Sequence, residues 1–370
     1  MFDEKTTLDR AVAKVAKTAR RVRDAIPYRT VDGIFDDMKD SDIAWWTNGF
    51  WPGILWLAYR ETGDEELAAW ATGAELRLDR ALEEHLGLHH DVGFMWKLSS
   101  VARYAIKGGE DARRRGLHAA NLLAGRFNLA GRFLRAWNDD KVGWAIIDCL
   151  MNLPLLYWAS AQTGDPRFRQ IAEAHTETAQ KHFLYSDGSS KHIVEFDPNT
   201  GAYLRNYGGQ GYADGSAWSR GAAWALHGFA LGAHFTGRPD FLASASLVAD
   251  FFLDNLPADG VPFSDFKAPP RENVHKDSSA GSCAASGLLL LSGLCCGEKR
   301  GRYADGARRI LAGLDATCSG PEGDEALLQH GCTAFHETKP GWRDTSLVYG
   351  DYFYLEALIR LRGREGLFQI

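Results

Sequence analysis

Apolar residues in this chain recur mainly at helical spacing, in runs that short glycine-containing turns interrupt. Five such turns are "ETGDEEL" (61–67), "KGGEDAR" (107–113), "QTGDPRF" (162–168), "FTGRPDF" (235–241) and "CGEKRGRY" (296–303). Glycine is the preferred residue just after a helix, and Asp or Pro suits the start of the next one. Each turn therefore predicts a hairpin of two helices.

The two ends of the chain complete the pattern. Helices predicted near 5–23 and near 346–363 have no hairpin partner and can pair as a sixth unit. Twelve helices in six hairpins fit an open solenoid or a closed ring, but a solenoid needs polar capping repeats. We therefore predict an all-α fold, an (α/α)6 barrel formed by one domain over residues 1–370. The main candidate for a short strand hairpin is "KHIVEF" (191–196).

Long loops rich in Trp, His, Asp and Gly separate the hairpins. They cover residues 42–53, 87–96, 135–148, 206–224 and 273–282. Each loop leads into the first helix of a hairpin, so in a ring all of them lie on one face, around one cavity. Loops on a rigid scaffold are a common place for catalytic and binding residues, and we expect the functional site there.

Asp148 is the first candidate for chemistry. It lies in "GWAIIDCLMNLPLLYWA" (143–159), which is otherwise almost wholly apolar and predicts a buried helix. A buried carboxylate is costly unless it is paired or used. One interpretation is structural, with Asp148 bonded to the backbone or to an arginine. The other is catalytic, because burial raises the pKa of a carboxyl group and lets it donate a proton near neutral pH.

Asp91 is the candidate partner of Asp148. It lies in "HHDVGF" (89–94), immediately before a predicted helix. Two carboxyl groups in different environments can divide an acidic and a charged role. Alone, Asp91 would be read as a helix N-cap. A metal site formed by His89, His90 and Asp91 is a third interpretation, which we disfavour because adjacent side chains rarely converge on one ion.

The segment "QGYADGSAWSRGAAW" (210–224) supplies candidate binding residues. The planar fork of Arg220 suits a substrate carboxylate, and the alternative is a buried ion pair, for example with Asp214. His192 could close over the cavity as a lid or simply pack. Tryptophans that could stack on a sugar or fill the core are Trp45, Trp46, Trp137 and Trp224.

Composition narrows the class of partner. The 12 Trp, 12 Tyr and 19 Phe, several of them beside polar residues, suit carbohydrate recognition. A net charge of −6 argues against nucleic acid or an anionic membrane surface as partner. The amphipathic pattern at the N-terminus differs from a secretory signal, so we expect a cytoplasmic location. The six cysteines form no C-x-x-C pair and are expected to be reduced core thiols.

Several segments together resemble the unsaturated glucuronyl hydrolases of glycoside hydrolase family 88. They are "WWTNGFWPGILW", "HHDVGFMW", "IIDCLMNLPLLYWA", "QGYADGSAWSRGAAW", "KDSSAGSCAASGLLLL" and "SLVYGDYFYLEALIRL". They follow one another over positions 45–361, nearly the whole chain. The related unsaturated rhamnogalacturonyl hydrolases share the barrel but usually lack the first of the two acids, so Asp91 favours the glucuronyl branch.

The resemblance implies the barrel and a hydration reaction. The substrates would be lyase-generated oligosaccharides with a 4,5-unsaturated uronic acid at the non-reducing end. Asp148 would donate a proton to C4 and assist addition of water at C5, while Asp91 would hold ring hydroxyls and tune Asp148. The implied substrate-binding residues are Trp46, His90, Trp137, His192, Gln210, Trp218, Arg220 and Trp224. The position of Trp218 is shifted relative to the family's aromatic residue. The resemblance implies no metal or cofactor.

Substrate choice depends on the loop "CTAFHETKPGW" (332–342). Family members that act on sulfated disaccharides carry a Ser-x-x-Ser-x-Lys pattern there, whereas this chain has Lys339 without the serines. We therefore predict a preference for unsulfated or differently sulfated substrates, such as those from hyaluronan or chondroitin. Two alternatives stay open: a rhamnogalacturonyl hydrolase or other carbohydrate enzyme on the same barrel, and a helical-repeat scaffold without catalytic activity.

Overall fold

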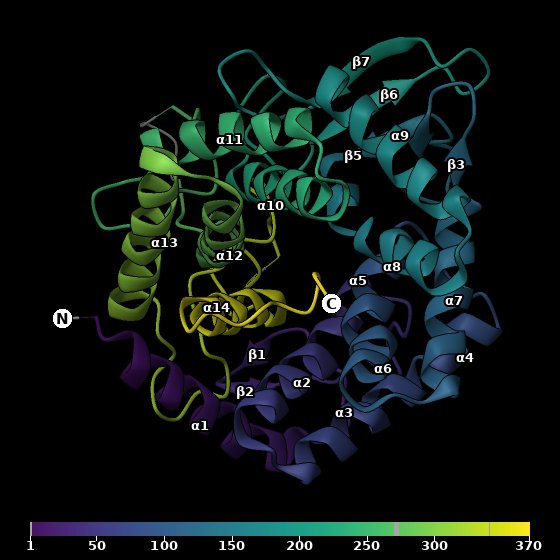
Figure 1. Ribbon diagram of the computed structural model, residues 1–370. Helices are drawn as coiled ribbons and strands as arrows, with labels where there is room; N and C mark the ends of the chain where they lie inside the picture. The colour runs from purple at the N-terminus through teal and green to yellow at the C-terminus, as the bar shows by residue number, and fades with distance from the viewer. Residues whose placement is uncertain (1, 270–273, 340) are drawn as a thin grey trace.

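Six helical hairpins form a closed ring in the computed structural model, which describes residues 2–269, 274–339 and 341–370 (Figure 1). The outer helices are α1 (Glu4–Val22), α3 (Glu65–Arg77), α7 (Glu110–Ala124), α9 (Pro166–Phe183), α11 (Pro239–Asp254) and α13 (Gly297–Thr317). The inner ones are α2 (Phe50–Thr62), α8 (Pro154–Thr163), α10 (Ser219–Thr236), α12 (Ser278–Leu294), α14 (Val348–Leu361) and a composite helix described below. The predicted (α/α)6 barrel is confirmed.

Burial separates the two layers of the ring. In α10 every residue from Ser219 to Ala233 is buried, as expected for an inner helix covered on all sides. In α1 the buried residues recur at positions such as Leu8, Ala11 and Val15, so only one stripe faces the ring. The hydrophobic core thus runs between the two layers and through the barrel centre.

The hairpin turns have the conformations that the sequence predicts. Gly63, Gly164 and Gly237 end their helices in the left-handed region, with φ of 70°, 72° and 68°. Glycine adopts this conformation without the steric cost of a Cβ atom. Asp64 and Asp165 then cap the next helix, since each side chain accepts a hydrogen bond from the backbone two residues on.

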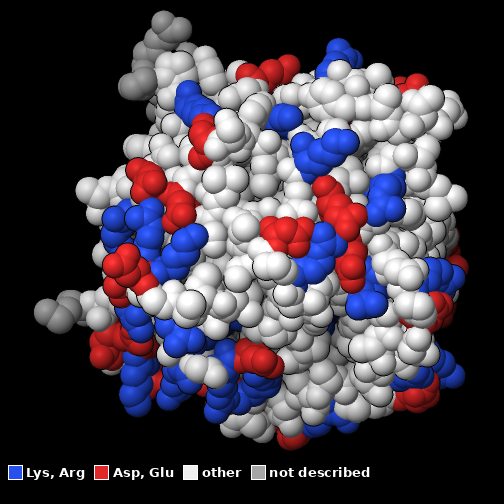
Figure 2. All heavy atoms as spheres, turned by 45° about the horizontal axis from the view of Figure 1, so that its top comes forward, with Lys and Arg blue, Asp and Glu red and all other residues white. Residues whose placement is uncertain are grey.

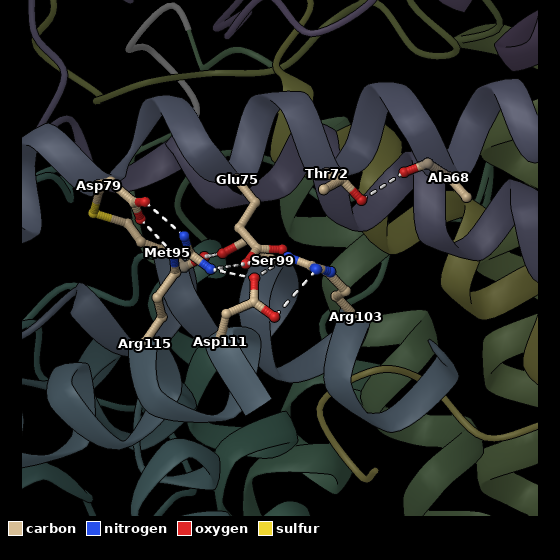
Figure 3. A network of polar contacts seen from close by, with 9 residues as sticks. All are labelled: Ala68, Thr72, Glu75, Asp79, Met95, Ser99, Arg103, Asp111 and Arg115. Atoms are coloured by element: carbon tan, nitrogen blue, oxygen red, sulfur yellow. Dashed lines mark hydrogen bonds and ion pairs between the residues drawn. The ribbon is translucent and has the colours of Figure 1, made fainter. Parts of the chain in front are cut away.

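One inner helix is composite. It consists of α5 (Val92–Trp96), a π-helical turn η2 (Lys97–Val101) and α6 (Ala102–Lys107). A buried ionic network joins this stretch to α3 and α7 (Figure 3). Glu75 on α3 is fully buried, and its Oε1 lies 3.4 Å from both Arg103 and Arg115. Asp111 pairs with the same two arginines, so the buried carboxylate is compensated by charge.

The segment 143–159 differs from its prediction. In place of one helix it forms β5 (Trp144–Ile146), the 3-10 helix η3 (Ile147–Met151) and then α8. The short strand pairs with β6 (Ile193–Phe196), and Pro154 begins α8, where its missing N–H costs nothing. An apolar run of this kind does not separate a buried strand from a buried helix.

The predicted strand hairpin is part of a three-stranded antiparallel sheet. β6 lies in its middle, between β5 and β7 (Tyr203–Tyr207). Short two-stranded pairs join β1 (Thr30–Val31) to β2 (Ile34–Phe35) and β3 (Phe127–Asn128) to β4 (Phe133–Leu134). Two further short helices are η1 (Trp46–Gly49) and α4 (Asp79–Glu83).

The length of the helices and the distribution of charge on one face can be read from the structure. Within the described residues no helix is both long and apolar enough to cross a bilayer. On the face shown in Figure 2, acidic and basic side chains are interspersed. This mixture agrees with the small net charge of −6 and offers no continuous basic track on that face.

Candidate active site

The long loops meet at one end of the barrel, as predicted. The backbone N–H of His90 donates to the carbonyl of Ala136, and that of Ile147 donates to His192. The N–H of Phe335 donates to the carbonyl of Gln210, which brings the 332–342 loop to the same place. Of the predicted loop 273–282, Asn273 lies outside the described residues.

Asp148 lies in the first turn of η3, where the sheet ends and the 3-10 helix begins. Its side chain is 17% exposed, and its Oδ1 has no hydrogen-bond partner among the described residues. Burial raises the pKa of Asp148 to about 7, although the positive charge of Arg220 opposes the shift. The group can therefore hold a proton near neutral pH and is reached from solvent.

Asp91 lies at the end of the loop that enters α5. Its side chain makes no capping hydrogen bond, so the N-cap interpretation is wrong. It accepts instead from Nδ2 of Asn152, at 3.0 Å. Burial, followed by the negative charge of Asp148, raises the pKa of Asp91 to about 8. The charge of Asp148 therefore helps to keep a proton on Asp91.

His192 is positioned by a hydrogen bond to one of its ring nitrogens. Nδ1 accepts a hydrogen bond from the backbone N–H of Gln210, at 2.9 Å. The proton of the neutral imidazole is thereby placed on Nε2, which lies 3.7 Å from Oδ1 of Asp148. Burial lowers the pKa of His192 to about 3, so the ring is neutral at physiological pH. The ring also packs on Trp218, with centroids 4.4 Å apart.

Arg220 is buried among acceptors from three segments of the chain. Its Nη1 lies 2.9 Å from Oδ2 of Asp277 and donates to the carbonyl of Cys332. Its Nη2 donates to Oε1 of Gln210 at 2.6 Å and to the carbonyl of Thr333 at 2.7 Å. The ion-pair interpretation is therefore right in kind, but the partner is Asp277. Asp214 instead accepts from the backbone of Gly208.

The predicted tryptophans fall into two groups. Trp46 packs on Tyr349, with ring centroids 4.8 Å apart. Trp46 also makes an edge-to-face contact with Trp224, which is fully buried. Trp137 lies on the sheet side, 5.9 Å from Trp144. Trp45 instead meets the edge of Tyr28. Half-buried Trp46 and Trp137 thus have ring surface on which a sugar could stack, and Trp224 packs against Trp46.

Asn152 and Asp277 are site residues that the sequence analysis missed. Asn152 holds Asp91 with its amide nitrogen, and its amide oxygen accepts from the N–H of Phe94, at 2.7 Å. Asp277 caps α12 as well as pairing with Arg220. A polar residue four positions after Asp148 in apolar sequence was the available signal for Asn152. The partner of Arg220 had no signal in the local pattern.

His89, His90 and Asp91 come closer together than expected. Their ligand-type atoms all lie within 4.8 Å of one another. The expectation that three adjacent side chains would diverge is wrong, because the chain turns sharply into α5 at this point and the two imidazole rings stack at 5.4 Å. Burial is the main reason that the pKa of each histidine is lowered, for His89 to about 4.

Comparison with known proteins identifies the family. The family model for Glycosyl Hydrolase Family 88 matches residues 18–233. An unsaturated glucuronyl hydrolase of Bacillus sp. (strain GL1) is 37% identical, with 96% of each chain covered. The chain belongs to glycoside hydrolase family 88. It is a glycoside hydrolase of the unsaturated glucuronyl hydrolase type, which excludes the scaffold without catalytic activity.

Other family 88 proteins support the same assignment. An unsaturated chondroitin disaccharide hydrolase of Streptococcus pyogenes serotype M1 is 35% identical over 85% of this chain and 80% of its own. The crystal structure of an unsaturated glucuronyl hydrolase from Bacillus sp. GL1 superposes with a TM-score of 0.92, at 34% identity and 99% coverage of both chains. The likeness therefore extends over the whole barrel.

Proposed function

We propose that this enzyme releases the 4,5-unsaturated uronic acid from the non-reducing end of glycosaminoglycan oligosaccharides by hydrating its vinyl ether. The observation that carries the proposal is a pair of buried carboxyl groups among half-buried tryptophans: Asp91, held by Asn152, and Asp148, which lies 3.7 Å from His192. Burial raises the pKa of both. A solved Streptococcus agalactiae relative, with one aspartate replaced by asparagine, is complexed with dGlcA-GalNAc6S. That ligand supports the substrate class.

The proposed chemistry begins with the proton held by Asp148. Its transfer to C4 removes the double bond and leaves an electron-deficient C5, which the neighbouring ring oxygen stabilises. A water molecule then adds to C5 and returns a proton to the Asp148 carboxylate, so the acid is regenerated. The product is a hemiketal, whose ring opening releases the remaining saccharide. The His192 Nε2–H faces Asp148 and is placed to stabilise its carboxylate after the first transfer.

Asp91 has the supporting role in this scheme. It accepts a hydrogen bond from Asn152 and is flanked by His90, whose ring nitrogens have no hydrogen-bond partner among the described residues. Those free groups suit the hydroxyls of a uronate ring. The amide oxygen of Gln210 accepts a hydrogen bond from Arg220. The amide nitrogen of Gln210 therefore points to other partners. Both terminal nitrogens of Arg220 already donate to the protein. Direct binding of the substrate carboxylate by Arg220 therefore stays a prediction.

The 332–342 loop supports a preference for substrates without a 6-sulfate. Lys339 lies over the ring of Trp342, at 4.6 Å from its centroid. The carboxylate of Glu337, two residues earlier, accepts the N–H of Lys339 and adds negative charge to the loop. A sulfate approaching this loop would meet the carboxylate of Glu337, and like charges repel.

Kinetics on unsaturated disaccharides test the reaction and the preference together. We expect the vinyl ether absorbance to fall on mixing with disaccharides from hyaluronan or unsulfated chondroitin. We expect kcat/KM for a 6-sulfated hexosamine to be lower, by about tenfold, the effect of roughly 1.4 kcal/mol of repulsion. A clear preference for the 6-sulfated compound would reject the specificity. Failure to consume any of them would reject the activity.

The rate should depend on pH through the acid. Asp148 must be protonated to act, so we expect kcat/KM to fall as pH rises through about 7 and to approach a tenfold loss for each further pH unit. The raised pKa also means that the folded state binds this proton more tightly than the unfolded chain. Its contribution to stability is therefore lost as pH rises from about 4 towards 7. Circular dichroism at each pH separates loss of catalysis from unfolding, and a flat profile between pH 6 and 9 would contradict the assignment.

A further inference from the structure

His89, His90 and Asp91 form a compact set of donor atoms at the start of α5. Oδ2 of Asp91 lies 3.4 Å from Nε2 of His90 and 3.5 Å from Nδ1 of His89. His90 is fully buried, and neither of its ring nitrogens has a hydrogen-bond partner among the described residues. A buried imidazole without partners is uncommon in a folded protein and indicates a missing ligand.

The two separations from Asp91 match those between ligand atoms in a zinc site. Zinc binds imidazole nitrogen at about 2.0–2.1 Å and carboxylate oxygen at a similar distance, so two ligand atoms of a tetrahedral ion lie about 3.4 Å apart. We propose that His89, His90 and Asp91 bind a divalent transition-metal ion such as Zn²⁺, and that the bound ion inhibits the enzyme. Two imidazoles, one carboxylate and an open fourth position for water form a common zinc ligand set.

The surroundings allow entry of the ion and limit its affinity. The side chain of His89 is 21% exposed and lines a cavity together with His85 and Arg126. The guanidinium of Arg126 donates to the carbonyls of Ala136 and Trp137, which holds its positive charge near the donors. This charge opposes a second cation, so we expect binding in the micromolar range. The 3.4 Å contact from the N–H of Asp91 to Nδ1 of His89 is long and is readily replaced by the ion.

Inhibition follows if the ion occupies Asp91 and His90, and this half of the inference rests on the proposed function. The ion and the substrate would use the same two side chains, so the inhibition should be competitive. Added Zn²⁺ should raise the apparent KM and leave kcat unchanged. Binding of the metal itself needs no catalytic role for Asp91 and is measured separately.

The test is a calorimetric titration of the chelator-treated enzyme with ZnCl₂, paired with Co²⁺ absorption spectra. We expect one equivalent to bind, with the intense visible bands of tetrahedral cobalt. In His89→Phe, which keeps a ring stacked on His90, we expect affinity to fall at least tenfold. Activity without metal should stay near that of the parent, because His89 has no place in the proposed reaction. The matched control is His118→Phe, which changes an exposed histidine on α7 and should leave zinc affinity unaltered.

The outcomes separate the two halves of the inference. Equal zinc affinity in the parent and in His89→Phe, or no saturable binding, would overturn the metal site. Saturable binding with purely noncompetitive inhibition would overturn the claim that the ion occupies the substrate site. If the metal-free parent enzyme hydrates none of the unsaturated disaccharides, the proposed function is rejected. The zinc-binding result is not affected by that outcome.

Discussion

Replacing Asp148 by asparagine should reduce kcat/KM by about three orders of magnitude while the barrel stays folded. The carboxamide has nearly the same shape but carries no transferable proton, and general acid catalysis is commonly worth about 10²–10⁴-fold. The neighbours of Asp148 tolerate the change, because its Oδ1 has no hydrogen-bond partner among the described residues. The measurement is the loss of vinyl ether absorbance under single-turnover conditions, with circular dichroism to confirm the fold.

Two further variants set the scale for this result. Asp140→Asn changes an exposed acid on the preceding loop and should leave turnover within about twofold. Asp91→Asn should impair turnover severely but leave more activity than Asp148→Asn, because it removes a supporting group and keeps the acid. Near-parental turnover in Asp148→Asn would show that another group supplies the proton.

Much of the fold could be predicted because local residues determine it. Glycines with φ near 70° and the aspartates that follow them set two of the hairpin turns, and both signals are visible in the sequence. Segment 143–159 was predicted as one helix because its apolar run hides a change of structure. Only pairing with β6, about 50 residues later, makes Trp144–Ile146 a strand. Non-local pairing of this kind leaves no periodic trace in three residues.

For the site, the sequence offers a set of residues, whose roles stay a prediction, but not their arrangement. Asp91 and Asp148 are predicted to act as a pair, and burial, followed by the negative charge of Asp148, raises the pKa of Asp91. The hydrogen bonds that orient them come from residues chosen by tertiary contact, such as Asn152. Adjacent positions in the sequence argue against the convergence of His89 with His90. The side chains converge because the chain turns sharply into α5.

The ion pair of Arg220 with Asp277 should account for a large share of the stability of the site. In Arg220→Met we expect the free energy of unfolding to fall by about 3–5 kcal/mol, the usual cost of breaking a buried pair and leaving one charge alone. Oδ2 of Asp277 would lose its only hydrogen-bond partner among the described residues, and Gln210 would lose the donor to its amide oxygen. Urea denaturation followed by tryptophan fluorescence measures the change.

Comparison variants separate the effect of breaking the buried ion pair from the effect of removing any arginine. Arg302→Met removes an arginine that is 45% exposed and pairs with Asp250 and Asp254, and it should cost at most about 1 kcal/mol. Adding Asp277→Asn to Arg220→Met should restore part of the loss, because an amide oxygen can still cap α12 and no lone charge stays buried. A cost for Arg220→Met no greater than that for Arg302→Met would show that the pair adds nothing beyond a surface contact. The main role of Arg220 would then be to bind substrate. Arg220→Met should in that case raise KM and leave the free energy of unfolding nearly unchanged.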